Sequence, residues 1–488
     1  MRNKFVQMTF SDIYSDIEAD VTTQHDDFLD LLDEYINFNA IIPDSFFRAF
    51  YKNTGRKHDN SLESFIRGLV IQRFRGFDKD TNFLLLLRTS PVHADFCGFN
   101  KIPDAPAWSR FKNQYADEIA GVFERLVEIT EPICRKLDKK KSDYLIYDTT
   151  GFELPVAENN PKFLNGFLKS SKKYAKDNID YNPYIGAYSM MPDTSKKCSA
   201  AKQQYINGHF CYAVKAGITT NGLGIVRNIQ LFDDDFKSKH QDIVTPKSDK
   251  PDIDKEIGDS ISLKPILSDF FESHPKFSYK TFIGDSAFDS YDTYSMLKHD
   301  FHFERACIPI NPRNSKASYE NKENKAPDKS MPKPVLFDEN GIPLCPLDKT
   351  PFISLGKSKD KHHSLRYKFV CHKSKKIGSK RICICETPCT DSNYGRCVYI
   401  NPDKDFRLCP GITRGSEHWN NLYHYRVTVE RTINLFKDTF AVGTRRSINT
   451  ATLKADLYIA GITQLLGVIL AHAIHKPELY KSVRKLAA

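Results

Sequence analysis

The chain has 488 residues, more than one ordinary hydrophobic core requires, so we expect two or three domains. Its formal net charge is +10 at pH 7, a moderate excess that is compatible with a polyanionic partner. Hydrophobic residues make up 40% of the chain, which is typical of a folded soluble protein. The first 20 residues are polar and acid-rich, which argues against a secretory signal, and we expect a protein of the reducing cytoplasm.

Residues 1–141 are predicted to form a helical N-terminal domain. Helical periodicity with capping signals occurs at residues 61–70, 80–87 and 107–130, and the last of these helices is expected to end before Pro132. Arg110 and Lys112 suit a helix-turn-helix-like reader of a DNA end, but a plain helical bundle explains the pattern equally well. No Lys or Arg lies between Phe5 and Phe47, so we expect nucleic acid to lie against later parts of the chain.

Residues 142–312 are predicted to form the first part of an α/β domain. Residues 144–150 form a short β-type run that ends near Asp148, and a polar excursion over residues 152–207 follows. Strands are then expected at 209–218, 224–231, 279–283 and 306–310, with helices at 261–271 and 290–298. This order matches a ribonuclease H-like fold, in which a mixed sheet flanked by helices carries acids on neighbouring strands.

A long helix is predicted around residues 419–437, within the segment 412–475 that we assign to the last part of the same domain. At about 100° per residue, five large side chains project from one narrow stripe of this helix. They are Trp419, Tyr423, Arg426, Glu430 and Lys437. A carboxylate can hold a metal ion, basic groups can hold phosphates and aromatic rings can stack on an exposed base. A solvated face with an Arg426–Glu430 ion pair is the alternative.

Asp148 and Asp285 each follow an apolar strand, where a lone carboxylate is costly without a partner. Two-metal phosphodiester chemistry needs hard oxygen ligands from about three converging carboxylates. Acids on two adjacent strands, together with Glu430 on a later helix, would supply that geometry. The alternative role for either Asp is a helix cap or turn.

These motifs resemble the insertion-sequence transposases of the DDE class, whose ribonuclease H-like core carries two Asp and one Glu. Within that class, the chain resembles the group marked by Tyr, Arg, Glu and Lys separated by two, three and six residues. Every spacing is kept in this sequence, by Tyr423, Arg426, Glu430 and Lys437. The other motifs are Tyr147-Asp148-Thr149-Thr150, Gly284-Asp285-Ser286-Ala287-Phe288-Asp289 and the helical segment at 103–111. The resemblance covers residues 60–475.

The resemblance implies that Asp148, Asp285 and Glu430 ligate two Mg²⁺ ions, for which Mn²⁺ can substitute. Arg426 and Tyr423 would then hold the phosphate next to the cleaved end, and Lys437 would contact the backbone nearby. Trp419, from its place on the stripe, would either stack on a flipped base of the DNA end or pack beneath the helix. The family cuts at terminal inverted repeats, often through a hairpin, and inserts the element elsewhere. Its partners are double-stranded transposon ends and target DNA, its usual assembly is a homodimer, and its location is the nucleoid of a prokaryotic cytoplasm.

Relatives place an insertion between the second acid and the Glu, and residues 313–411 are predicted to fill that role. Residues 357–381 contain ten Lys or Arg and one acid, which favours contact with nucleic acid over a plain solvated loop. The insertion is also rich in potential ligands of a structural Zn²⁺, although reduced free thiols explain the same residues. They are Cys345, Cys371, His372, Cys383, Cys385, Cys389, Cys397 and Cys409.

Residues 457–474 carry no formal charge over 18 positions, the length of a membrane-spanning helix. Thr463, Gln464 and His472 favour a buried helix of a soluble domain, so no membrane partner is expected. Residues 476–488 are assigned to a tail.

Two other functions remain open. One is a ribonuclease H-like nuclease that hydrolyses DNA without strand transfer. The second is a domesticated DNA-binding protein that has lost catalysis, although all three acids are present.

Overall fold

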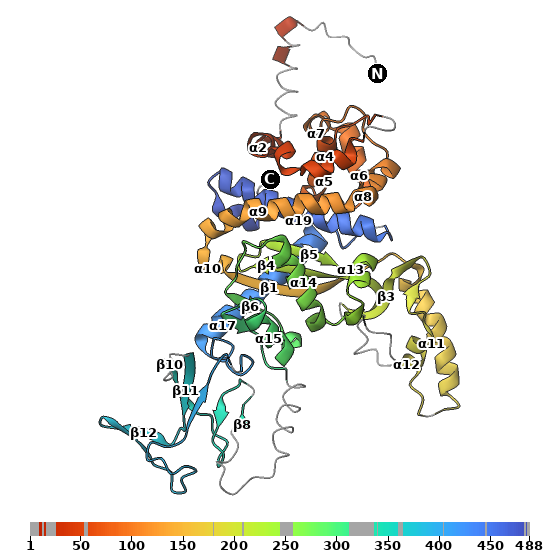
Figure 1. Ribbon diagram of the computed structural model, residues 1–488. Helices are drawn as coiled ribbons and strands as arrows, with labels where there is room; N and C mark the ends of the chain where they lie inside the picture. The colour runs from red at the N-terminus through yellow and green to blue at the C-terminus, as the bar shows by residue number, and fades with distance from the viewer. Residues whose placement is uncertain are drawn as a thin grey trace.

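The computed structural model describes residues 9–11, 14–15, 26–52, 57–178, 180–206, 209–244, 257–311, 336–338, 340–359, 365–403, 405–444, 447–482 and 485. Among the predicted segments, the charged stretch 314–334 and most of the tail after residue 482 lie outside the described residues. The described chain is an α/β structure with a mixed sheet and many helices, as expected from the sequence. In Figure 1 it is arranged as a helical layer, a central sheet and two projecting parts.

The N-terminal layer is helical. It contains α2 (Asp27–Tyr35), α3 (Phe38–Ile41), α4 (Asp44–Phe50), α5 (Leu62–Phe74), α6 (Asp80–Thr89), α7 (Pro91–Cys97), α8 (Ala105–Gln114), α9 (Ala116–Leu137) and α10 (Lys139–Ser142). Ser61 caps α5 as predicted, because its hydroxyl accepts the Ser64 amide at 3.0 Å.

The expected stop before Pro132 is wrong. The helix breaks instead at Tyr115, and α9 continues through Pro132 to Leu137. Pro132 removes only one donor, and the buried face of α9 supplies enough packing to carry the helix across it.

The main sheet has the order β2-β3-β4-β1-β6-β7, with β5 also paired to β4. Its strands are β1 (Tyr144–Glu153), β2 (Thr194–Ser195), β3 (Cys198–Ile206), β4 (His209–Asn221), β5 (Val226–Leu231), β6 (Thr281–Ile283) and β7 (Arg305–Cys307). β1 is antiparallel to β4 and parallel to β6, and β6 is parallel to β7. The helices α13 (Asp234–Lys239), α14 (Asp259–Ser273) and α15 (Tyr291–His299) accompany these strands.

The strands and helices predicted for residues 209–310 are present, with boundaries shifted by a few residues. The region that was expected to be a polar excursion is more ordered than predicted. It contains α11 (Pro161–Ala175) and α12 (Pro183–Met190), which project from the sheet in Figure 1, and the edge strands β2 and β3.

One long helix near the C-terminus joins the two layers. α19 (Thr450–Ala473) packs against α9, α5, α8 and β5. By length and composition it is able to cross a membrane, but 89% of its most apolar window is buried inside the protein. This is the position of a core helix, as the polar residues within it led us to expect.

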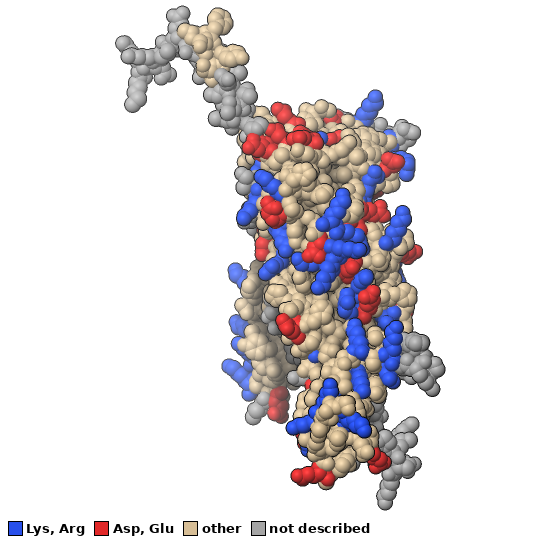
Figure 2. Space-filling view, turned by 90° about the vertical axis from the view of Figure 1, so that its left-hand side faces the viewer, with Lys and Arg blue, Asp and Glu red and all other residues tan. Residues whose placement is uncertain are grey.

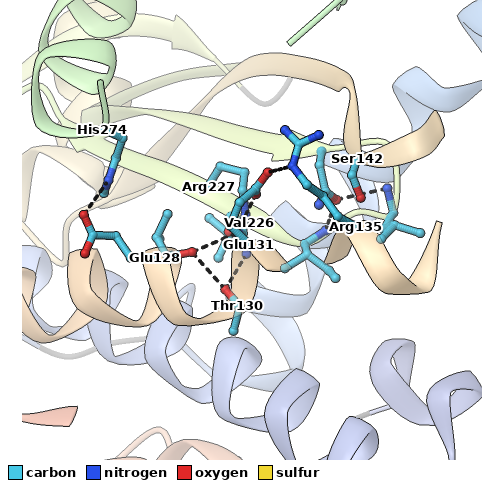
Figure 3. Close-up of polar contacts among 12 residues, drawn as sticks. Glu128, Thr130, Glu131, Arg135, Ser142, Val226, Arg227 and His274 are labelled. Carbon is cyan, nitrogen blue, oxygen red and sulfur yellow. Dashed lines mark hydrogen bonds and ion pairs between the residues drawn. The ribbon is translucent and has the colours of Figure 1, made fainter. Parts of the chain in front are cut away.

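A buried ionic cluster fixes α9 to the sheet (Figure 3). Arg227 on β5 is 0% exposed, and its guanidinium donates to the Thr130 hydroxyl at 2.9 Å and to the Val127 carbonyl at 3.1 Å. Glu131 on α9 completes the pairing at 3.4 Å and also binds Arg135 at 2.8 Å. Removing either partner would leave a buried charge unpaired, so the cluster fixes the helix on the sheet.

The insertion forms a separate β-rich part. Its described strands are β8 (Leu336–Phe337), β9 (Pro343–Leu344), β10 (Ile353–Lys359), β11 (Leu365–Val370), β12 (Ser374–Ile377), β13 (Lys380–Cys383) and β14 (Cys397–Ile400). They form one sheet of order β10-β11-β14 and two hairpins, and they extend away from the main sheet in Figure 1. A small core of their own lies between them.

Candidate active site

Asp148 and Asp285 come from adjacent parallel strands. The register pairs Ile146 of β1 with Ile283 of β6, so two further residues along each chain lead to Asp148 and Asp285. Asp148 does not end its strand as predicted, because β1 continues to Glu153 and pairs Asp148 with Ile218 of β4. Asp285 does follow its strand, where the sheet edge turns into a 3₁₀ turn.

Glu430 comes from a helical segment that crosses this edge of the sheet. The segment comprises α17 (Glu417–Tyr423), a 3₁₀ turn (His424–Arg426), α18 (Val427–Asn434) and a π turn (Leu435–Thr439). Val429 and Phe436 are each 0% exposed and hold the apolar side against the core. Thr432 donates its hydroxyl to the Gly224 carbonyl at 2.7 Å, which fixes α18 to the β4–β5 turn.

The guanidinium of Arg426 lies between the three carboxylates. It forms an i,i+4 ion pair with Glu430, and its Nη2 lies 3.4 Å from Asp148 Oδ2 and 3.9 Å from Asp285 Oδ2. Three acids separated by up to 282 positions in the sequence (430 − 148) therefore converge on one cation. Their oxygens do not all lie within 4.8 Å of one another.

Asp148 is the acid of this group with a strongly perturbed titration. Burial raises the pKa of Asp148 to about 6; Arg426 opposes this rise, and Asp285 adds to it. Its side chain is 18% exposed, against 35% for Asp285 and 41% for Glu430. A carboxylate in this environment favours a compensating positive charge.

A fourth acid, which we did not predict, lies beside Asp148. Asp259, in the first turn of α14, accepts the Thr149 hydroxyl at 2.5 Å and the Lys215 ammonium at 2.6 Å. Its charge also contributes to the raised pKa of Asp148. Asp259 follows Gly258, the N-cap of α14, and nothing in the local sequence separates it from an ordinary helix-start acid.

The loop that carries Asp285 is held by a second buried ion pair. Asp285 accepts the Ala287 amide at 2.8 Å, so its predicted alternative role as a cap is present alongside its place in the cluster. Asp289, which is 0% exposed, binds Arg407 through two contacts of 2.9 and 2.8 Å. The sequence motif contained Asp289, but its partner comes from the far end of the insertion and was not predicted.

Trp419 and Tyr423 form a stacked pair beside the carboxylates. Their ring centroids lie 4.9 Å apart with an interplanar angle of 15°. Burial raises the pKa of Tyr423, opposed by the nearby Arg426 and reinforced by Asp285. The indole Nε1 of Trp419 is buried without a hydrogen-bond partner.

Lys437 is not part of this cluster. Its ammonium lies 5.3 Å from the ring centroid of Phe152, four residues beyond Asp148 and therefore about 13 Å further along β1. The uniform 100° spacing placed Lys437 on the stripe of Glu430, but the π turn changes the direction of its side chain.

The two basic residues proposed for the N-terminal helices differ in exposure. Lys112 is 2% exposed and pairs with Asp80 at 3.0 Å and with Asp456 of α19 at 3.2 Å. Arg110 is exposed on the same helix. Lys112 is therefore a core residue that stabilises a helical bundle, and it is not available to contact DNA.

The N-terminal part of the chain is similar to a known class of domain. Residues 16–114 match the family described as a transposase domain (DUF772). The match covers α2 to α8 and ends before the sheet begins. No curated protein matches the chain.

Among solved structures, the chain aligns with the cryo-EM structure of a piggyBac transposase synaptic complex with hairpin DNA. The alignment covers 94% of this chain and 78% of that chain, at 10% identity and a TM-score of 0.38. A likeness of this size says nothing about individual residues of the site.

Proposed function

We propose that the protein is a DNA transposase whose catalytic carboxylates are Asp148, Asp285 and Glu430. The observation that carries the proposal is the convergence of these three acids on Arg426 at one edge of the sheet. The match of residues 16–114 to a transposase domain supports the same class of protein independently of the acids.

The order of the sheet supports a ribonuclease H-like core. The run β5-β4-β1-β6-β7 has antiparallel pairs on one side of β1 and parallel pairs on the other. Asp148 lies on the central strand of this run, and Asp285 follows its parallel neighbour. The helix with Glu430 then approaches the same edge, and β2, β3 and the insertion are additions to this core.

The donor set fits divalent magnesium. Three carboxylates supply only oxygen ligands, which Mg²⁺ and Mn²⁺ prefer. Burial makes the anionic form of Asp148 costly, and a cation beside it would remove that cost. Asp148, Asp285 and Glu430 would hold two such ions, which would supply activation of the attacking oxygen and stabilisation of the leaving oxygen.

Arg426 is suited to exchange its carboxylate partners for a DNA phosphate. A guanidinium binds two phosphate oxygens as readily as it binds carboxylates. In cleavage, the oxygen of water would form a bond to phosphorus while the bond to the leaving DNA oxygen breaks. In strand transfer a DNA hydroxyl would replace water, and the Tyr423 and Trp419 rings would border the end being held.

The test compares cleavage of a DNA end in Mg²⁺ by wild type and by Glu430→Gln, which keeps the shape of the side chain and removes its charge. We expect the variant to bind the end and to lose cleavage by at least about 100-fold, because a metal ligand is removed. Glu417→Gln, an exposed Glu in the first turn of α17, is the matched control and should cleave normally. Equal cleavage by the two variants would contradict the assignment.

The products distinguish the proposal from the two other functions. A donor DNA incubated with supercoiled plasmid gives joined products for a transposase, nicks alone for a nuclease and only a mobility shift for a binding protein. Assembly as a homodimer on the two ends is part of the proposal, and it predicts a complex with two protomers.

A further inference from the structure

Two buried thiols and an imidazole meet inside the insertion. One ligand atom from each of Cys345, Cys371 and His372 lies within 4.8 Å of the others. The Cys371 sulfur is 3.9 Å from His372 Nδ1. Ligand atoms of a tetrahedral zinc site are separated by about 3.5–3.8 Å, given Zn–S of about 2.3 Å and Zn–N of about 2.0–2.1 Å. The cluster is thus within small side-chain movements of a metal-binding geometry.

The orientation of His372 favours a metal ligand over a surface residue. Its Nε2 lies 3.2 Å from Asp348 Oδ2, so Nδ1 is the nitrogen that faces the thiols. A carboxylate that binds the outer nitrogen of a metal-ligating His is a recurrent arrangement, since it fixes the ring and raises its basicity. Asp348 itself is held by Lys373 at 3.2 Å and by the Thr350 amide at 3.1 Å.

The three residues come from two separate segments that need a link. Cys345 directly follows β9, whereas Cys371 and His372 directly follow β11. Cys345 and Cys371 are 1% and 4% exposed and belong to a small core with five other residues. A core of this size gains little from apolar burial alone, and such parts of proteins are often stabilised by a metal ion.

A structural zinc takes four ligands, so one more is needed beyond the three that meet here. The segment between β13 and β14 carries two half-buried thiols, Cys385 and Cys389. Either thiol is a candidate for the fourth position, in a set of three thiolates and one imidazole.

We propose that the insertion binds one structural Zn²⁺ through Cys345, Cys371 and His372, with a thiol of the segment between β13 and β14 in the fourth position. The ion would join three segments of the insertion and would bring with it the adjoining basic strands β10 to β13. All described cysteines are free thiols, which is the form that zinc binding requires. This site is separate from the carboxylate cluster, whose oxygen ligands select a different class of metal.

The test is the zinc content of full-length protein purified in reductant and dialysed against metal-free buffer. We expect one zinc per chain in wild type and a loss of at least about tenfold in the Cys345→Ser/Cys371→Ser variant. Cys397→Ser is the matched control, since this half-buried thiol contacts the Gly395 carbonyl instead of the cluster and should keep the zinc. Asp348→Asn should raise the Kd for zinc by about 10–100-fold.

A second measurement does not depend on the folding of a variant. Wild-type protein stripped by a chelator and refilled with Co²⁺ should show the thiolate-to-cobalt charge-transfer absorption of a tetrahedral site, and Zn²⁺ should abolish it. Wild type with less than about a tenth of a zinc per chain and no thiolate–cobalt absorption would overturn the proposal. Equal zinc in wild type and in the double variant would also overturn it.

Discussion

At the scale of single residues, the environment of Asp148 has a consequence for stability. Burial raises its pKa from the ordinary value of 3.8 to about 6, so the folded protein binds a proton more tightly than the unfolded chain does. In metal-free buffer, the stability contributed by this proton is complete below about pH 4 and decreases as the pH rises to about 6. The free energy of unfolding should fall by roughly 3 kcal/mol through this residue, most of it between about pH 4 and pH 6.

The measurement is the difference between the stability of wild type and Asp148→Asn across that range, in the presence of a chelator. Asn cannot titrate, so the variant should become relatively more stable as the pH rises from 4 to 6. A difference that does not change with pH would show that Asp148 has an ordinary pKa.

The position of Trp419 leads to a prediction about one chemical step, hairpin formation or strand transfer. Its ring stacks on Tyr423 and both side chains are partly exposed, so a displaced base of the DNA end could extend the stack. Trp419→Ala should slow hairpin formation or strand transfer by about 5–150-fold, equivalent to the roughly 1–3 kcal/mol of one base stack. Initial nicking should change much less, and Trp419→Phe should restore most of the rate. Equal loss in both steps would exclude stacking.

At the scale of elements, α19 is joined to the N-terminal helices by buried charges. Asp456 is 3% exposed and accepts Arg73 at 2.7 Å and Lys112 at 3.2 Å. Asp456→Ala would leave two buried cations without this partner and should cost about 3–5 kcal/mol in the free energy of unfolding. Asp117→Ala, which removes an exposed partner of Lys454, should cost at most about 1 kcal/mol by chemical denaturation.

The helices and strands also show how much of the fold could be predicted from the sequence. Strands and helices over residues 209–310 could be predicted because each has one clear period and clear turn residues between them. The continuation of α9 through Pro132 could not be predicted from the sequence, because it depends on packing against α19, which lies more than 300 residues later. The helix α12 was missed because its apolar residues do not gather on one face, and α11 was missed although its apolar residues recur at helical spacing within a Lys-rich segment.

The candidate site likewise contains residues that could be predicted from the sequence and residues that could not. The spacing of Tyr423, Arg426 and Glu430 predicts that they share one face of a helix, because an α-helix repeats every 3.6 residues. Lys437 was misplaced, since a uniform helix cannot anticipate a π turn. Asp259 and Arg407 were missed because their partners lie far away in the sequence, where no local pattern reveals a contact.

At the scale of the whole molecule, charge is unevenly distributed. Figure 2 shows Asp and Glu gathered near the upper end, whereas Lys and Arg predominate over the middle, with acids interspersed among them there and at the lowest tip. The strands of the insertion carry stacked basic and aromatic groups, such as Arg366 at 4.0 Å over Tyr399 and Lys368 at 4.7 Å over Tyr394. The expectation that nucleic acid lies against later parts of the chain than the acidic N-terminal segment stays a prediction.

The uneven charge predicts how binding depends on salt. Lys375→Ala with Lys380→Ala, both exposed on the β12–β13 hairpin, should weaken binding of duplex DNA and reduce the salt slope by about 2. The control replaces Lys264 and Lys280, which are equally exposed but lie near Asp300 and Glu304. An unchanged slope in the first variant, measured from 50 to 200 mM salt, would show that the hairpin does not contact phosphate.

The burial of α19 has a consequence for the order in which the protein is made. α9 leaves the ribosome long before α19, and at about 5–20 residues per second the intervening 336 residues (473 − 137) take roughly 20–70 s to synthesise. During that time the face of α9 that α19 covers has no permanent partner, and Glu430 is made only 20 residues (450 − 430) before α19 begins. A chain that stops before α19 therefore exposes this part of its core to chaperones and proteases. The carboxylate cluster and the core helix are both complete only when translation has passed α19.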